Sequence, residues 1–119
     1  MYKVLFYEDE KKESPTEDFL DELQPKVRAK VEKWIDKLEQ EGPNLPRPFA
    51  DIVRGKIREL RISFGSQCCR LMYFFVGKNI IVTHGFMKKT DKIPPNEIER
   101  AERIMTIFTK RYHGGEIKL

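Results

Sequence analysis

Three apolar runs joined by two short turns constrain the fold of this chain more than any other feature. The runs are IRELRISF (57–64), CCRLMYFFV (68–76) and IIVTHGF (80–86), and the turns are GSQ and GKN. In the first run Leu60, Ile62 and Phe64 alternate with polar residues, as in a strand with one buried face. The third run is apolar on both faces, as in a central strand. Tight turns between such strands predict an antiparallel meander.

The flanking segments predict one further strand and three helices. YKVLFY (2–7) reads as a strand, and SPTE (14–17) supplies a serine cap and a first-turn proline for a helix. A second helix is predicted to begin near Pro25 and to end at Gly42-Pro43, so the pair forms a helical hairpin. The proline-rich residues 42–55 are expected to be irregular, and a last helix is predicted from Pro94-Pro95 to about Tyr112.

The order of these elements indicates an α+β domain that spans residues 1–119. The predicted order is strand, helix, helix, three strands and helix, and we expect the helices to pack on one face of the sheet. The opposite face would then be free to bind a partner. The apolar share of 39% is well above that of a disordered chain, and the length suits one domain.

The N-terminal sequence and the cysteines predict a cytoplasmic protein without a metal. MYKVLFYEDE lacks the features of a secretory signal, and no window approaches eighteen consecutive apolar residues. Cys68 and Cys69 are neighbours on a strand and point to opposite faces, so a bond between them would strain the backbone. We expect two packing residues in a reducing compartment, no zinc site and no cofactor.

The charges of the chain are unevenly distributed along it. Residues 54–92 carry nine Lys or Arg and only two Asp or Glu, whereas residues 1–53 carry nine and thirteen. A basic sheet segment beside acidic helices indicates a polyanion as the partner of one face. A solvated surface rich in ion pairs would give a similar pattern, and this alternative stays open.

Two arginines of the meander are candidates for binding a phosphate. Arg61 and Arg70 are expected to lie side by side on the face opposite Leu60 and Ile62. Two adjacent guanidinium groups repel each other unless an anion lies between them, and their planar shape suits phosphate oxygens. The alternative is that each arginine pairs with a carboxylate, for which Glu59 is the nearest in sequence.

A second basic cluster follows the third strand, in HGFMKKTDKIPP (84–95). It contains His84, Lys88, Lys89 and Lys92, and it leads into the last helix, whose N-terminus favours an anion. An imidazole beside fixed cations suits RNA cleavage, in which a 2′-hydroxyl loses a proton and attacks the adjacent phosphorus. A structural histidine at a strand end is the alternative.

The candidate catalytic and RNA-binding residues follow from these two clusters. Arg61 and Arg70 would stabilise charge on the phosphate, His84 would act as base or acid, and Lys88 would take the remaining proton role. Met72, Phe74 and Phe86 offer stacking surfaces, although most aromatic residues at this spacing belong to a core. The candidates for RNA binding are Arg58, Phe86, Lys89 and Lys92.

The segment 55–101 closely resembles the RelE/HigB superfamily of bacterial toxins, in particular its phage-derived HigB-like branch. The resemblance rests on ELR (59–61), on an arginine followed by an apolar and aromatic run (70–76), on HGFMKKT (84–90) and on a proline-started helix that contains ERA (99–101). The N-terminal strand and helical hairpin also fit, so the likeness covers almost the whole chain and implies a RelE-like fold.

The resemblance implies the toxin of a type II toxin-antitoxin system, which cleaves mRNA in the ribosomal A site without a metal. Its partners would be the ribosome, the message and an antitoxin, often a helix-turn-helix HigA-like protein in this branch. Arg61 and Arg70 match the phosphate-contacting positions of the family. His84, Lys88 and Lys89 match its basic cluster, which Lys92 extends.

Two positions depart from the family or stand outside its pattern. Cys69 lies where the family usually has Tyr or Phe before the arginine, which would matter if that aromatic residue positions the arginine. His113 is expected in a C-terminal tail, and it would approach the basic face only if the tail folded back. Two other functions stay open, namely a ParE-like gyrase inhibitor and a toxin that has decayed into a nucleic-acid-binding domain.

Overall fold

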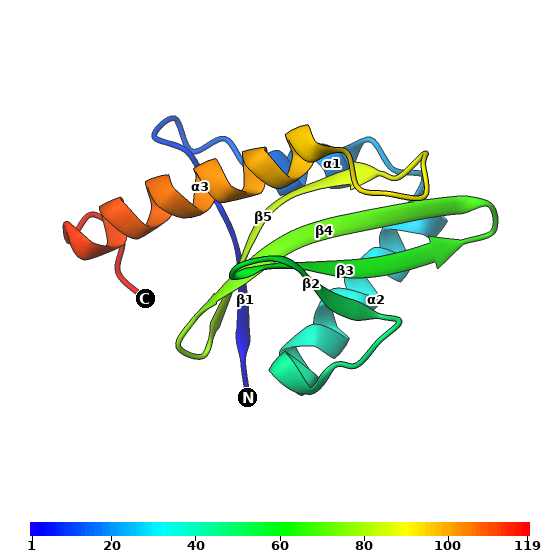
Figure 1. The fold of residues 1–119 in the computed structure, drawn as a ribbon, viewed down its shortest axis with the longest axis horizontal. Coiled ribbons are helices and arrows are strands. Elements are labelled where there is room, and N and C mark those ends of the chain that lie inside the picture. Colours follow the sequence, from blue (N-terminus) through cyan, green and yellow to red (C-terminus); the bar gives the residue numbers. More distant parts are fainter.

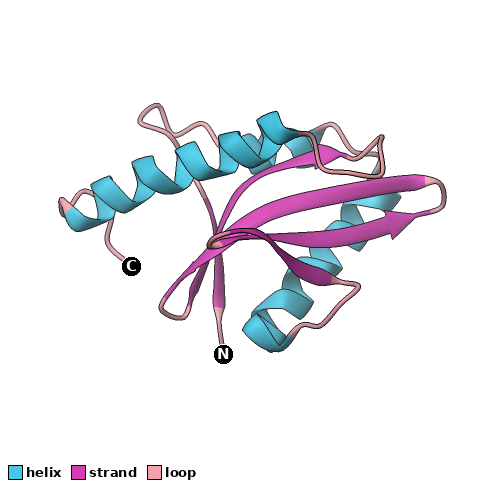
Figure 2. Ribbon diagram, viewed as in Figure 1, coloured by secondary structure: helices cyan, strands magenta, loops and turns pink.

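A computed structural model describes residues 1–119 and contains one mixed sheet of five strands with three α-helices (Figures 1 and 2). The elements in chain order are β1 (Lys3–Phe6), α1 (Pro15–Asp21), α2 (Pro25–Glu41), the short 3-10 helix η1 (Gly42–Asn44), β2 (Ala50–Arg54), β3 (Ile57–Phe64), β4 (Gln67–Val76), β5 (Asn79–Met87) and α3 (Pro95–His113). The α+β class, the N-terminal strand and the C-terminal helix are therefore confirmed, and α1 and α2 lie where two consecutive helices were predicted.

The sheet has the spatial order β1-β5-β4-β3-β2. β3, β4 and β5 form the predicted antiparallel meander, and β1 pairs with β5 in parallel. Gly65 and Gly77 lie in the two hairpin turns at φ of 59° and 58°, a backbone conformation that glycine adopts without steric cost. The strand β2 was not expected, because its segment follows a proline-rich stretch. It pairs antiparallel with β3 and extends the sheet.

The helices cover both faces of the sheet, which corrects the expectation that all of them pack on one face. One cluster of 14 buried residues joins α1 and α2 to one face. A second cluster of eight buried residues joins α3 to the other face, with Phe108 packed against Phe74. The cause lies in the central strands, since β4 and β5 carry apolar side chains on both sides and each side needs a cover.

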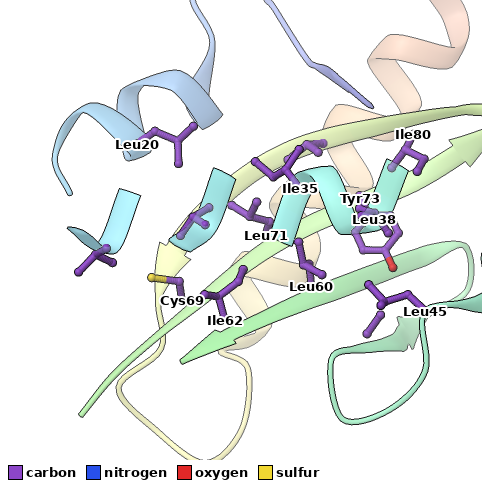
Figure 3. Packing of buried hydrophobic residues seen from close by; sticks show 14 residues of the cluster. Leu20, Ile35, Leu38, Leu45, Leu60, Ile62, Cys69, Leu71, Tyr73 and Ile80 are labelled. Atoms are coloured by element: carbon purple, nitrogen blue, oxygen red, sulfur yellow. The ribbon is translucent and has the colours of Figure 1, made fainter. Parts of the chain in front are cut away.

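The larger cluster fixes the position of β3 and β4 against α2. Leu60, Ile62 and Leu71 project from the sheet toward Ile35 and Leu38 of the helix (Figure 3). Leu60 and Leu71 are fully buried, and burial of each such side chain contributes about 1.5–3 kcal/mol. The residues that alternate with them on β3 and β4 therefore face the α3 side.

Candidate functional site

The strand register brings Arg61, Arg70, His84 and Phe86 onto the α3 side of the sheet. Arg61 is the register partner of Arg70, Arg70 is the partner of Phe86, and Met72 is the partner of His84. Side chains of directly opposed residues on a sheet lie within contact distance of one another. The expected proximity of Arg61 and Arg70 is confirmed.

The two arginines converge on a carboxylate of the protein itself. Arg70 Nε lies 2.8 Å from Glu59 Oε1, and Arg61 Nε lies 3.2 Å from the same oxygen. The pairing with Glu59, which the sequence left as the alternative, is thus the arrangement in this structure. Both contacts use Oε1, so Oε2 of Glu59 remains available for another partner. The side chains of Glu59 and Arg70 are only 7% and 10% exposed, whereas that of Arg61 is 31% exposed.

A second carboxylate extends this group toward β2. Asp51 Oδ2 lies 3.2 Å from Arg61 Nη2 and 3.0 Å from Arg47 Nε. The hydrogen bond from Arg47 lowers the pKa of the Asp51 carboxyl below its usual value, with smaller contributions from a backbone hydrogen bond and from Arg61. Arg47, Asp51, Glu59, Arg61 and Arg70 form what we call the arginine cluster. It holds three guanidinium groups and two carboxylates, so it carries one excess positive charge.

His84 lies on the same face but is fully buried under the start of α3. Its Nε2 lies 3.3 Å from Glu97 Oε1, and its Nδ1 lies 3.0 Å from the Thr83 hydroxyl. Because a carboxylate only accepts, the contact with Glu97 places a ring hydrogen on Nε2. The Thr83 hydroxyl donates to Met72 O over 3.2 Å and also lies within hydrogen-bond distance of Nδ1. The ring also stacks against Phe86, with centroids 5.8 Å apart. Both nitrogens therefore have partners within the protein.

The surroundings of His84 keep its ring neutral at physiological pH. Burial, together with smaller contributions from the positive charges of Arg100 and Arg103, lowers the pKa of His84 to about 4. A ring with this pKa is a weaker base than free imidazole, and it has no direct contact with solvent. His84 therefore connects β5 to α3 through its contact with Glu97 and is not an exposed proton carrier.

The lysines beyond β5 lie at the rim of this face. The Lys88 backbone N–H donates to Cys68 O over 2.8 Å, which continues the β4-β5 pairing by one residue. By strand alternation the Lys88 side chain is on the side of Phe86 and Arg70, and it is partly exposed. Lys89 and Lys92 are exposed on the connection to α3. These three lysines add positive charge to the connection between β5 and α3.

Three other residues singled out in the sequence do not join the cluster. Arg58 lies on the opposite face, with its guanidinium 5.2 Å from the centre of the Phe75 ring. Cys69 is buried in the core beneath α1 and α2, so its thiol points away from the arginines, and burial raises its pKa. His113 ends α3, about 24 Å along the helix from Glu97 at 1.5 Å per residue.

Two features of this region were not predicted from the sequence, namely the central place of Glu59 and the contribution of α2. Glu59 was expected only as an alternative partner, although that carboxylate contacts both arginines. Lys30 and Trp34 of α2 were not among the candidates, although they line a hollow together with Arg61 and Arg70. Their spacing within a helix was the available signal, since residues four apart share one helix face. No group of three or more His, Cys, Asp or Glu side chains is placed to hold a metal ion.

The sequence that forms this fold matches a known family of phage-derived proteins. The family model described as "Phage derived protein Gp49-like (DUF891)" matches residues 18–106, from α1 to α3. The protein therefore belongs to the Gp49-like family of phage-derived proteins, a toxin-like family of the RelE/HigB kind. No curated protein matches the chain. No helix has the length and apolar character needed to cross a membrane.

Proposed function

We propose that this protein is the toxin of a type II toxin-antitoxin pair and that it cleaves mRNA on the ribosome. The adjacent arginines Arg61 and Arg70 are the observation that carries this proposal, because they lie on the same sheet face as Phe86 and because Arg61 is partly exposed there. Family membership supports the toxin class and an antitoxin as partner. The place of action would be the cytoplasm, where ribosomes and messages are found.

In the proposed reaction the 2′-oxygen of one nucleotide attacks the adjacent phosphorus. The 2′-hydroxyl gives its proton to a base, a new P–O bond forms, the P–O5′ bond breaks and the 5′-oxygen receives a proton. The products are a 2′,3′-cyclic phosphate and a 5′-hydroxyl. Arg61 and Arg70 bind the non-bridging oxygens and offset the negative charge that builds there. The chemistry needs no oxidant, reductant or metal.

Two side chains of this face suit the proton transfers. Glu59 holds both arginines through Oε1, and Oε2 is the proposed acceptor of the 2′-hydroxyl proton. The Lys88 ammonium, on the same face next to Phe86, is the proposed donor to the 5′-oxygen. Lys89 and Lys92 would contact phosphates of the bound RNA.

His84 takes a positioning role in this proposal rather than the direct proton transfer that its sequence context predicted. Its ring is neutral, fully buried and bound at both nitrogens. It holds the first turn of α3 through Glu97 and supports the ring of Phe86. The direct role stays a prediction, and the pH dependence of cleavage distinguishes the two roles.

The test is cleavage of a defined message in a purified translation system. Arg70→Lys keeps the charge but loses the planar paired donors, so we expect kcat to fall about 100-fold, the effect of removing one stabilising donor. Arg28→Lys is the matched control, because Arg28 of α2 forms exposed ion pairs with Asp21 and Glu17 of α1 and is not part of the arginine cluster. Equal cleavage by wild type and Arg70→Lys would refute the assignment.

A further inference from the structure

A hollow of about 390 Å³ lies at the end of the sheet next to the arginine cluster. The pairing of β2 with β3 ends where the Arg61 N–H donates to Phe49 O over 2.7 Å. Beyond this point β3 has no strand partner on that side, and α2 lies beside it (Figure 1). The hollow is lined by Lys30, Trp34, Pro48, Phe49, Arg61, Ser63 and Arg70. It thus reaches from the cluster to α2.

The lining of the hollow is cationic. Lys30, Arg61 and Arg70 are among the lining residues, and no acidic residue is. The carboxylates that pair with Arg61 and Arg70 leave the arginine cluster one excess positive charge, to which Lys30 adds another. The Lys30 ammonium donates to the Ser63 carbonyl, which directs the lysine side chain over the unpaired edge of β3. Such a concentration of fixed positive charge favours an anionic ligand.

Aromatic rings form one wall of the same hollow. Trp34 stacks on Phe49 with ring centroids 4.8 Å apart and an angle of 26° between the planes. Phe49 is 39% exposed, which leaves ring surface for a ligand. An exposed aromatic stack beside cations is the arrangement that binds unpaired bases and their phosphates.

The cationic lining continues from this hollow along α2. A second hollow of about 660 Å³ shares Lys30 and Trp34 with the first and adds Lys33, Lys37 and Phe64. The lysines at 30, 33 and 37 share one stripe of the helix. The Lys30 ammonium also lies 5.7 Å from the centre of the Phe64 ring. The two hollows together form a continuous track of cations and rings, which we call the α2 track.

We propose that the α2 track binds single-stranded RNA next to the phosphate held by Arg61 and Arg70. A base rests on the Trp34-Phe49 stack, Lys30 binds the phosphate beside it, and the strand continues over Lys33 and Lys37. The bound RNA must be single-stranded here, because the bases of a duplex stack on one another and do not expose their faces to a side chain. This inference deepens the proposed function, since the strand in the track is the substrate of the arginine cluster.

Trp34 is the only tryptophan of the chain, so intrinsic fluorescence reports on this site. The probe is a hexanucleotide of 2′-O-methyl RNA, whose blocked 2′-oxygens prevent cleavage. We expect the probe to quench Trp34 in the full-length protein. Lys30→Gln and Phe49→Leu should each weaken binding about tenfold, the order expected for loss of a stacking or phosphate contact.

Lys78→Gln is the matched control, because Lys78 is an exposed lysine in the turn between β4 and β5 and lines neither hollow. Its affinity for the probe should equal that of the wild type. Far-ultraviolet circular dichroism and thermal unfolding establish that each variant is folded. Lys30 is on the surface of α2, so Lys30→Gln gives a readout even if Phe49→Leu disturbs the loop.

Three results would overturn the α2 track as an RNA site. They are absence of quenching, equal affinity of Lys30→Gln and wild type, and equal or tighter binding of a hexaglutamate peptide or an RNA duplex. Cleavage of messages separates this inference from the proposed function. A protein that binds the probe through Trp34 but cuts no message refutes the nuclease and retains the track. A nuclease whose Phe49→Leu and Lys30→Gln variants bind and cut like the wild type refutes the track alone.

Discussion

Replacement of Glu59 by glutamine tests how the arginine cluster works. The carboxylate contacts both Arg61 and Arg70 beside the proposed phosphate position, so it competes with phosphate for their positive charge. Glu59→Gln keeps the size of the side chain and removes its charge. We expect three effects together, namely a less stable fold, tighter binding of RNA and loss of cleavage.

The loss of stability follows from the burial of the ion pair. Removal of one partner of a buried pair leaves the other charge uncompensated, which costs about 3–5 kcal/mol for full burial. Arg61 keeps its contact with Asp51, and Arg70 is slightly exposed, so we expect about 3 kcal/mol. In a chain of this length that loss lowers Tm by roughly 10 °C.

Binding of an anion should restore part of the lost stability. A ligand at 100 times its Kd stabilises the folded state by about 2.7 kcal/mol. We therefore expect the 2′-O-methyl hexanucleotide to raise the Tm of Glu59→Gln more than that of the wild type. Glu102→Gln is the control, since Glu102 pairs with Arg54 at the exposed side of α3 and should leave Tm and binding near their wild-type values.

The assay combines thermal unfolding, Trp34 quenching and message cleavage on the same preparations. The reasoning would be refuted by a Glu59→Gln variant that keeps the wild-type Tm and binds the hexanucleotide no more tightly. A variant that binds more tightly and still cleaves at the wild-type rate would refute Glu59 as the proton acceptor alone. In that case the carboxylate only orients the two arginines.

Three further predictions concern packing, protonation and charge. Gly85→Ala should lose about 1–3 kcal/mol in denaturant unfolding, because a Cβ there would lie 2.5 Å from Phe19 Cδ2 and 2.6 Å from Leu71 Cδ2. The pKa of His84 is about 4 in the folded protein and 6.5 for a free imidazole side chain. Between these two pH values the unfolded state binds more protons than the folded state, so the free energy of unfolding should fall by about 2 kcal/mol from pH 7 to pH 4.5. His84→Gln should lack this part of the fall, and its cleavage profile should keep the same inflections if His84 only positions α3. If three phosphates are contacted, the logarithm of the association constant for the hexanucleotide should fall with the logarithm of the salt concentration at a slope of about −2. An affinity that does not change with salt would contradict these phosphate contacts.

The meander was predictable because its signals are local. The alternation of Leu60 and Ile62 with polar residues determines which side chains of β3 lie on each face. Gly65 and Gly77 mark the two turns of the meander. The proximity of Arg61 and Arg70 follows from the same register. The two-residue alternation of side chains along the strands thus predicted both the meander and the proximity of the two arginines.

The placement of α3 was not predictable from its own sequence. Its apolar stripe specifies that it packs on a surface but not which face of the sheet provides that surface. The apolar residues on both sides of β4 and β5, such as Tyr73 and Phe74, were the available signal. The strand β2 was missed because Ala50–Arg54 is short, lies at the sheet edge and follows several prolines.

The burial of His84 could not be read from its position at a strand end. It depends on α3 crossing the end of β5 and bringing Glu97 to within 3.3 Å of the ring. The ion pairs of Glu59 likewise depend on side-chain geometry across β3 and β4 rather than on the sequence pattern. Composition indicated a basic face, but only the fold shows which of its charges are already paired.

Mapping of transcript 5′ ends after expression of wild type and Arg70→Lys decides whether the arginine cluster cleaves mRNA. We expect new 5′-hydroxyl ends within coding regions for the wild type, and about 100-fold fewer for a folded Arg70→Lys protein. Intact transcripts together with DNA breaks would instead indicate a gyrase poison. Intact transcripts and normal growth with a folded wild-type protein would indicate a domain that binds nucleic acid without cleaving it.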